Sequence, residues 1–220
     1  MCSSDLRRRE RRTERSKIDA TPPWEVRQRE EPPPTTGPYD ERDAPDDDVS
    51  RVDLGAVLVP VWRGVDLRLD VNEAQQVVSA TLASADGQMQ LGVFAAPRNE
   101  GIWDDVRDEI RQSLASQGGS TADEPEGPFG TELRGTLKGP EGSMPVRFVG
   151  IDGPRWFLRA MLVGPIAMNA TKAAPFEDAL RAIVVVRGSE PLPVREPVPL
   201  QLPKEAADQL GAGEPSPADS

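Results

Sequence analysis

Arginine and tryptophan side chains are the groups of this chain best suited to recognising a ligand. A guanidinium binds carboxylates and phosphates, and an indole offers a stacking surface. An anionic or nucleotide-like ligand is therefore the chemistry that is open to the chain, although tryptophans at such positions are more often part of a core. The candidate ligand-binding residues are Arg98, Arg147, Arg155, Arg159, Trp103 and Trp156.

Two of these arginines stand in neighbouring segments predicted to form a hairpin. If residues 152–154 are its loop, Arg147 pairs with Arg159 across the two strands. Like charges directly opposite each other on a sheet are unfavourable unless another group neutralises them. That group could be an anionic ligand or an internal acid such as Glu132 or Asp152, and we favour an internal acid.

Many catalytic chemistries are closed to the chain because it has no histidine and only one cysteine, Cys2. Without histidine, the usual base for a serine nucleophile is missing, and so is the side chain that exchanges protons near neutral pH. Neither a Walker motif nor a dinucleotide-binding fingerprint is present. The sequence leans against an enzyme, and we expect no catalytic residue and no cofactor.

The densest set of carboxylates lies on a predicted helix. Two of the acids have an arginine three residues further on, which is the spacing of ion pairs on a solvated helix face. We favour that interpretation over a Mg²⁺ site or a glycosidase pair, and we predict no bound metal. The acids are Asp104, Asp105, Asp108 and Glu109.

Two helices and about seven strands are predicted in the middle of the chain. An apolar residue at every fourth position predicts a helix over 101–117, with Asn99 as its cap. Pro175 suits the first turn of a second helix, which ends near a Val-Val-Val run that is either helix or short strand. The strands are predicted over 52–59, 65–71, 77–83, 89–95, 132–138, 144–151 and 155–163.

The pattern within these strands indicates how they are covered. Residues 65–71 alternate strictly between apolar and charged, as in a strand with one wet face. Both faces of the 144–163 hairpin carry large apolar groups, so its strands are expected to be central and covered on both sides. The order of the elements predicts an α+β fold, with two helices packed on a mostly antiparallel sheet.

Composition divides the chain into four parts. Residues 1–50 form a charged, proline-rich stretch that is expected to be disordered, and 51–190 form the α+β domain. Residues 191–203 are an extended proline-rich arm, and 204–220 a second disordered tail. The net charge is −11, which disfavours nucleic-acid binding by the core. No apolar run is long enough for a membrane span, and we expect a cytoplasmic protein.

Several blocks of the chain, read in order, carry a family resemblance. They include Gly-Pro-Tyr-Asp at 37–40, Glu-Gly-Pro-Phe-Gly-Thr-Glu-Leu at 126–133 and Gly-Ile-Asp-Gly-Pro-Arg-Trp at 150–156. Together they resemble a family of uncharacterised actinobacterial proteins, a domain of unknown function whose genes often neighbour the dUTPase gene. The resemblance implies a cytoplasmic protein and suggests nucleotide metabolism, but it supplies no activity, cofactor or site.

The resulting functional expectation is a non-catalytic binding or adaptor module with a protein partner. Its basis is the missing catalytic repertoire together with charged tails that can wrap a partner. The alternative is a protein that binds a small anionic or nucleotide-like ligand through the arginines and tryptophans named above.

Overall fold

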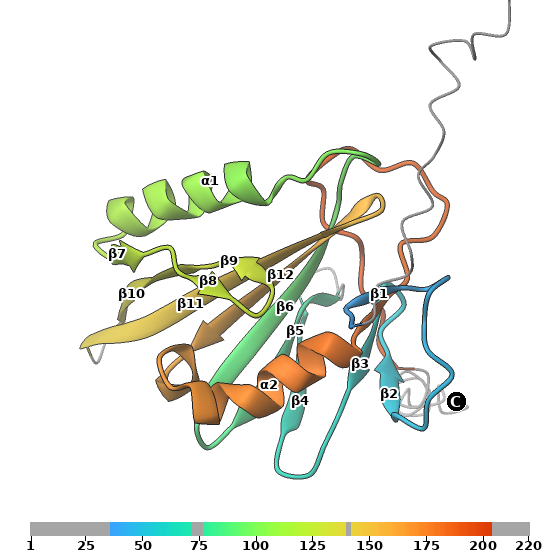
Figure 1. The fold of residues 1–220 in the computed structure, drawn as a ribbon, viewed down its shortest axis with the longest axis horizontal. Coiled ribbons are helices and arrows are strands. Elements are labelled where there is room, and N and C mark those ends of the chain that lie inside the picture. The colour runs from blue at the N-terminus through green and yellow to red at the C-terminus, as the bar shows by residue number, and fades with distance from the viewer. Residues whose placement is uncertain (1–35, 72–76, 140–141, 204–220) are drawn as a thin grey trace, which may run out of the picture. The chain divides into compact units, whose positions relative to one another are not determined.

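The computed structural model describes residues 36–71, 77–139 and 142–203. Its main sheet has seven strands, all antiparallel to their neighbours, in the order β4-β5-β6-β12-β11-β10-β7 (Figure 1). The α+β class with a mostly antiparallel sheet of seven strands and two helices is confirmed. The strands are Asp66–Val71 (β4), Val77–Ser84 (β5), Gly87–Ala95 (β6), Ser120–Asp123 (β7), Leu133–Gly139 (β10), Gly142–Gly153 (β11) and Trp156–Val163 (β12).

A smaller sheet of four short strands has the order β1-β13-β3-β2. Its strands are Tyr39–Asp40 (β1), Arg51–Asp53 (β2), Val57–Pro60 (β3) and Val184–Val185 (β13). The strand predicted over 52–59 is thus two antiparallel strands, since Gly55 takes a φ of +78° and turns the chain between them. Strand β1 lies inside the stretch expected to be a disordered tail, so ordered structure begins before residue 51. The predicted tails over 1–35 and 204–220 lie outside the described residues.

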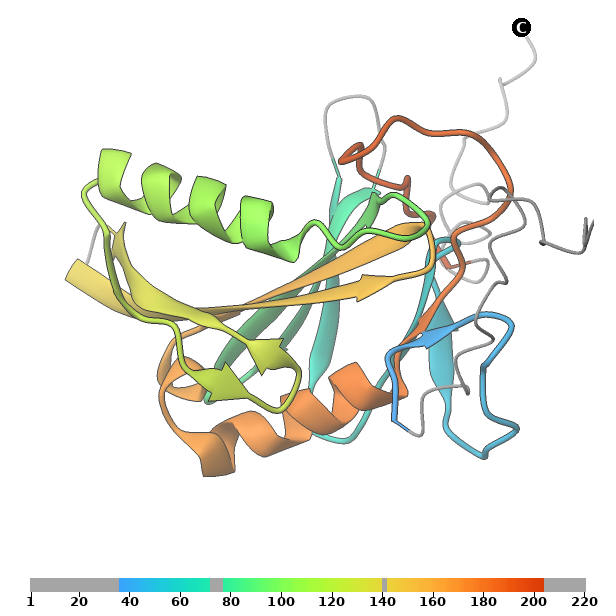
Figure 2. The same ribbon diagram turned by 45° about the horizontal axis from the view of Figure 1, so that its top comes forward.

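The two helices lie on opposite faces of the main sheet (Figure 2). On one face, Leu158, Ala160 and Leu162 of β12 pack with residues of α2 (Ala170–Ala182). On the other face, Phe157 packs with residues of α1 (Trp103–Ser116). The central hairpin is therefore covered on both sides, as its sequence predicts.

The register predicted for that hairpin is wrong. Its loop has two residues, Pro154 and Arg155, and Gly153 pairs with Trp156. Proline suits the first central position of a type II turn, and Arg155 takes a φ of +69° at the second. Because the ladder runs up to Gly153, Arg147 pairs with Leu162 and Arg159 with Gly150. Side chains alternate along a strand, so Arg147 faces α2 and Arg159 faces α1.

Helix α1 is capped from outside its own segment. It begins at Trp103, and the Asp152 carboxylate of β11 accepts hydrogen bonds from the backbone N–H groups of Ile102 (2.8 Å) and Trp103 (3.3 Å). Gly101 permits this approach, because a Cβ there would lie 2.6 Å from an Asp152 carboxylate oxygen. The predicted cap, Asn99, is too far upstream, and a residue distant in sequence takes its place.

Helix α2 starts earlier than predicted. Its first residue is Ala170, and Asn169 caps it by accepting a hydrogen bond from the Lys172 N–H at 3.1 Å. Pro175 therefore lies inside the helix rather than at its start. A turn of 3₁₀-helix over Pro165–Ala167 (η1) precedes it, and the uncertain valine run after it contains strand β13.

Replacing Asp152 with Ala should destabilise the protein by about 1 kcal/mol, because two N–H groups at the start of α1 lose their acceptor. Asp152→Asn retains an acceptor oxygen and serves as the control, with a smaller expected loss. Urea unfolding followed by circular dichroism measures both changes. Equal stability of the Ala variant and the wild type would contradict the capping role.

The proline-rich segment 191–203 lies along the sheet as an extended strap. Ala95 N–H donates to the Glu196 carbonyl (2.9 Å), and Val198 N–H donates to the Val93 carbonyl (2.9 Å). Strand β5 pairs with β6 only as far as Leu91, so the strap takes over as the neighbour of β6 beyond that point. This splayed junction of β5, β6 and the strap is where the sheet opens.

Candidate functional site

A cavity of about 380 Å³ lies at the splayed junction. Its floor is β6 at Gly92, which has no side chain to fill the space, and the strap forms one rim. Helix α1 contacts β7, β10 and β11, toward the far edge of the sheet. The polar and aromatic side chains of the lining are Asp70, Ser79, Gln90, Phe94 and Arg159.

Arg159 is the cation of this cavity. It is directly opposite Gly92 across β12 and β6, and its guanidinium lies 5.1 Å from the centre of the Phe94 ring. Burial lowers the pKa of the Arg159 guanidinium, because leaving water penalises the charged form. An arginine nevertheless stays protonated at neutral pH, so the cavity holds a half-buried positive charge.

The electrostatic environment of Arg159 differs from that of Arg111, Arg147 and Arg195, each of which pairs with two carboxylates. Within the described part of the chain, no carboxylate forms an ion pair with Arg159. A buried charge without a counterion is costly. The Phe94 ring offsets part of that cost through a cation–π contact, typically worth about 0.5–2 kcal/mol.

A chain of hydrogen bonds forms the opposite wall of the cavity. The Gln90 side-chain amide donates to the Ser79 hydroxyl at 3.1 Å, and that hydroxyl donates to the Asp70 carboxylate. Ser79 is buried, whereas Asp70, the last acceptor in this series of hydrogen bonds, is exposed. Asp70 lies on the face of residues 65–71 that was predicted to be wet, and it is directly paired with Ser79 between β4 and β5.

The strap is held to α1 by ion pairs beside the cavity. Arg195 binds Asp105 at 2.9 Å and also pairs with Glu109. A smaller hollow of about 120 Å³ lies under this bridge, and Arg159 lines it as well. Arg159 thus lines both spaces, and residues of the strap contribute to the lining of each.

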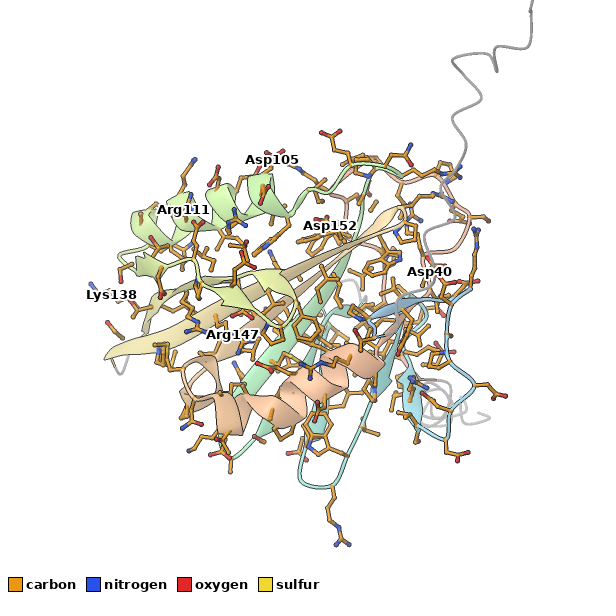
Figure 3. All side chains as sticks on the ribbon, in the orientation of Figure 1. Asp40, Asp105, Arg111, Lys138, Arg147 and Asp152 are labelled. Atoms are coloured by element: carbon orange, nitrogen blue, oxygen red, sulfur yellow. The ribbon has the colours of Figure 1, made fainter. Side chains whose placement is uncertain are left out.

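The other predicted site residues do not join Arg159. Arg147 lies on the α2 face, where it binds Glu132 at 2.8 Å and Glu177 at 2.7 Å. Figure 3 labels Arg147 between the sheet and α2, on the side away from Asp105 and Arg111 of α1. Of the two internal acids named as possible partners, Glu132 and Asp152, Glu132 binds Arg147, and Glu177 is a second partner that was not predicted.

The two candidate tryptophans, Trp103 and Trp156, are core residues on opposite faces of the sheet. Trp103 stacks on Phe157, with ring centres 5.9 Å apart, and its indole N–H donates to the Thr131 carbonyl. The indole N–H of Trp156 donates to the Asp40 carboxylate. Of the remaining candidates, Arg98 is exposed in a loop and Arg155 occupies the hairpin turn. The six residues therefore do not converge, and only Arg159 lines the cavity.

Buried Glu132 lies beneath the β8–β9 hairpin (Glu126–Gly127 and Gly130–Thr131). A Cβ at Gly127 would fall 1.9 Å from a Glu132 carboxylate oxygen, so only glycine lets the hairpin close over this group. Burial raises the pKa of Glu132 above its ordinary value of 4.5, although the charge of Arg147 acts in the opposite direction. The Gly-Pro-Phe-Gly motif thus covers an internal ion pair.

The raised pKa of Glu132 predicts a pH-dependent stability. At a pH between the unfolded-state and folded-state pKa values of Glu132, the folded state binds more protons than the unfolded state. Protonation of Glu132 therefore contributes its full stabilisation of the folded state below about pH 4.5, and this contribution is lost as the pH rises through the folded-state pKa. Relative to Glu132→Gln, which has no carboxyl group to titrate, the wild type should lose free energy of unfolding as the pH rises from about 4.5 through the raised folded-state pKa of Glu132. Urea unfolding across this range measures the difference.

Parallel pH curves for the two proteins would contradict the raised pKa. Arg147→Met serves as the companion variant, because it leaves buried Glu132 without its closest cation and should cost about 3–5 kcal/mol at neutral pH. Combining Arg147→Met with Glu132→Gln should recover part of that loss.

The acids of α1 form ion pairs on an exposed face, as their spacing predicts. Arg107 binds Asp104 at 3.0 Å and Glu124 at 3.3 Å, and Arg111 pairs with Asp108 and Glu124. Among the described residues, no group of three or more His, Cys, Asp or Glu is placed to hold a metal ion. No described helix has both the length and the apolar character needed to cross a membrane.

Comparison with known proteins identifies a family and distant structural similarities. The family model described as "Protein of unknown function (DUF3710)" matches residues 37–209. No curated protein matches the chain. Among solved structures, it is similar to a protein from Bacteroides thetaiotaomicron VPI-5482, with 13% identity and a TM-score of 0.38 over 72% of this chain and 54% of that one. The match thus spans about half the length of that protein.

Two further structures are similar over nearly their whole length. One is the cyanobacterial PsbP (CyanoP) from Synechocystis sp. PCC 6803, with 13% identity, a TM-score of 0.39, and coverage of 64% of this chain and 96% of that one. The other is LpqN of Mycobacterium tuberculosis, involved in cell envelope biogenesis, with 14% identity, a TM-score of 0.32, and coverage of 68% and 99%. Similarities at this level assign neither a ligand nor a partner to this chain.

Proposed function

The chain belongs to the DUF3710 family of proteins of unknown function, and we propose that it is a non-catalytic protein that binds a small anionic ligand. The observation that carries the proposal is Arg159, a half-buried cation that lines a cavity and has no ion-pair partner among the described residues. A carboxylate or phosphate on the ligand would supply the missing counterion.

The lining of the cavity is consistent with binding rather than turnover. Beside Arg159 it offers one carboxylate, one hydroxyl and one amide, and the hydroxyl of Ser79 already donates to Asp70. A serine nucleophile needs a neighbouring base that takes up its proton, and a carboxylate is a much weaker base than the histidine of the usual triad. These groups are suited to holding a ligand in place.

The fuller form of the proposal is a cytoplasmic actinobacterial protein with a link to nucleotide metabolism. The family resemblance and its dUTPase gene neighbourhood support that link. Because of this link, the ligands tested for binding should include deoxyuridine monophosphate and other nucleotides, beside simple carboxylates and inorganic phosphate.

A thermal-shift screen of the full-length chain tests the proposal. A ligand at 100 times its dissociation constant stabilises the folded state by about 2.7 kcal/mol, which corresponds to a rise in Tm of several degrees. Arg159→Met should weaken a hit by roughly 10- to 150-fold, since a hydrogen bond to a charged group is worth about 1.5–3 kcal/mol. Calorimetric titration measures that loss.

Arg98→Met is the matched control, because it removes an exposed arginine outside the cavity. It should leave the affinity unchanged. A flat screen, or a hit that Arg159→Met binds as tightly as the wild type, would overturn the proposal.

The adaptor role stays a second proposal, and its support is the charge and proline content of the terminal segments. The large apolar side chains exposed in the described residues come from six separate segments, so they do not mark one docking element. They are Val49, Val61, Val71, Met144, Met168 and Val194.

A further inference from the structure

We infer that the ligand of the cavity is bipolar, with an anionic group for Arg159 at one end and a hydrogen-bond donor, best an ammonium group, for Asp70 at the other. This inference rests on the proposed function and deepens it by naming the ligand class. It follows from the direction of the hydrogen bonds in the cavity wall and from the separation of its two charges.

The hydrogen-bond chain of the wall ends in an acceptor. Gln90 donates to Ser79, and Ser79 donates to one carboxylate oxygen of Asp70. The Ser79 proton is thereby used, and an ionised carboxylate can only accept. Beside the second N–H and the carbonyl oxygen of the Gln90 amide, the wall presents the remaining acceptor capacity of Asp70, and a ligand that satisfies Asp70 must bring a donor.

The charge of Asp70 is also unmatched. Within the segments that the structure describes, no cation forms an ion pair with Asp70, whereas the nearby Asp66 is paired with Arg68 at 3.7 Å. A ligand that carried only negative charge would gain from Arg159 but would be repelled by Asp70. A ligand that carries both signs is attracted at both ends.

Arg159 and Asp70 are too far apart to neutralise each other. Arg159 belongs to β12 and Asp70 to β4, and the strands β6 and β5 run between them. Three spacings of about 4.8 Å place the two backbones roughly 14 Å apart, and the splaying of β5 from β6 adds to this distance. A ligand that contacts both side chains must bridge the space that remains between them.

The space between the charges is suited to a short apolar body. Phe94 lies beside Arg159, and Pro197 of the strap forms the rim. A volume of about 380 Å³ is in the range of small-molecule sites. An aliphatic chain with a carboxylate at one end and an amine at the other has the required chemistry.

A matched ligand series tests this inference by calorimetric titration of the full-length protein. The probes are γ-aminobutyrate, 6-aminohexanoate and 8-aminooctanoate, each compared with the carboxylate of the same length that lacks the amine. At least one amino acid of the series should bind about tenfold or more tightly than its partner, the effect of one hydrogen bond to a charged group.

Two variants locate the effect. Asp70→Asn should abolish the preference for the amine while leaving the affinity for the plain carboxylate unchanged or higher. Asp66→Asn is the matched control, since Asp66 is exposed on the same strand and the same face outside the cavity lining. It should preserve the preference.

The outcomes separate this inference from the proposed function. If plain carboxylates, phosphate or nucleotides bind in an Arg159-dependent manner and the amines bring no gain, the bipolar ligand is wrong and anion binding stands. A preference that survives Asp70→Asn also overturns the inference. If neither this series nor the anionic panel binds, both fail.

Discussion

The pairing of β11 with β12 decides which arginine is neutralised inside the protein and which faces a cavity. Both strands are central and packed on both faces, so each side chain must lie on one face or the other. A two-residue turn at Pro154 and Arg155 fixes the register, and side chains alternate from there. Arg147 falls on the face of α2 and Arg159 on the face of α1. A register shift of one residue in one of the two strands would place both arginines on the same face.

The arginine on one face of the sheet is ion-paired, and the arginine on the other face lines a cavity. On the α2 face, Glu132 and Glu177 bind Arg147, and the β8–β9 hairpin closes over the group with a glycine against the carboxylate. On the α1 face, Gly92 and the splaying of β5 leave a space around Arg159 that the strap rims but does not fill. The same sheet thus carries a closed ion pair on one side and an open cation on the other, which gives the cavity its chemical character.

Local patterns predicted the elements well, because alternation and fourth-residue spacing are properties of the segments themselves. The strands from β4 to β6, helix α1 and the covered central hairpin follow from them. The loop length of that hairpin was missed because Asp152 and Gly153 are typical turn residues, although here they extend β11 and Asp152 caps α1. Of the residues that line the cavity, Arg159 could be chosen as a candidate because it is an arginine, and the alternation of residues 65–71 indicated that Asp70 lies on a solvent-facing side of its strand. Ser79, Gln90 and Phe94 could not be selected, since only the tertiary arrangement of β5, β6 and the strap brings them together.

Arginine side-chain nuclear magnetic resonance tests the central claim most directly. The Nε–Hε resonance of Arg159, assigned by its loss in Arg159→Lys, should shift saturably when 6-aminohexanoate or the best anionic ligand is added. The resonance of Arg147 should stay in place, because Glu132 and Glu177 already occupy its guanidinium. Saturable binding that moves Arg147 and leaves Arg159 unchanged would contradict the account.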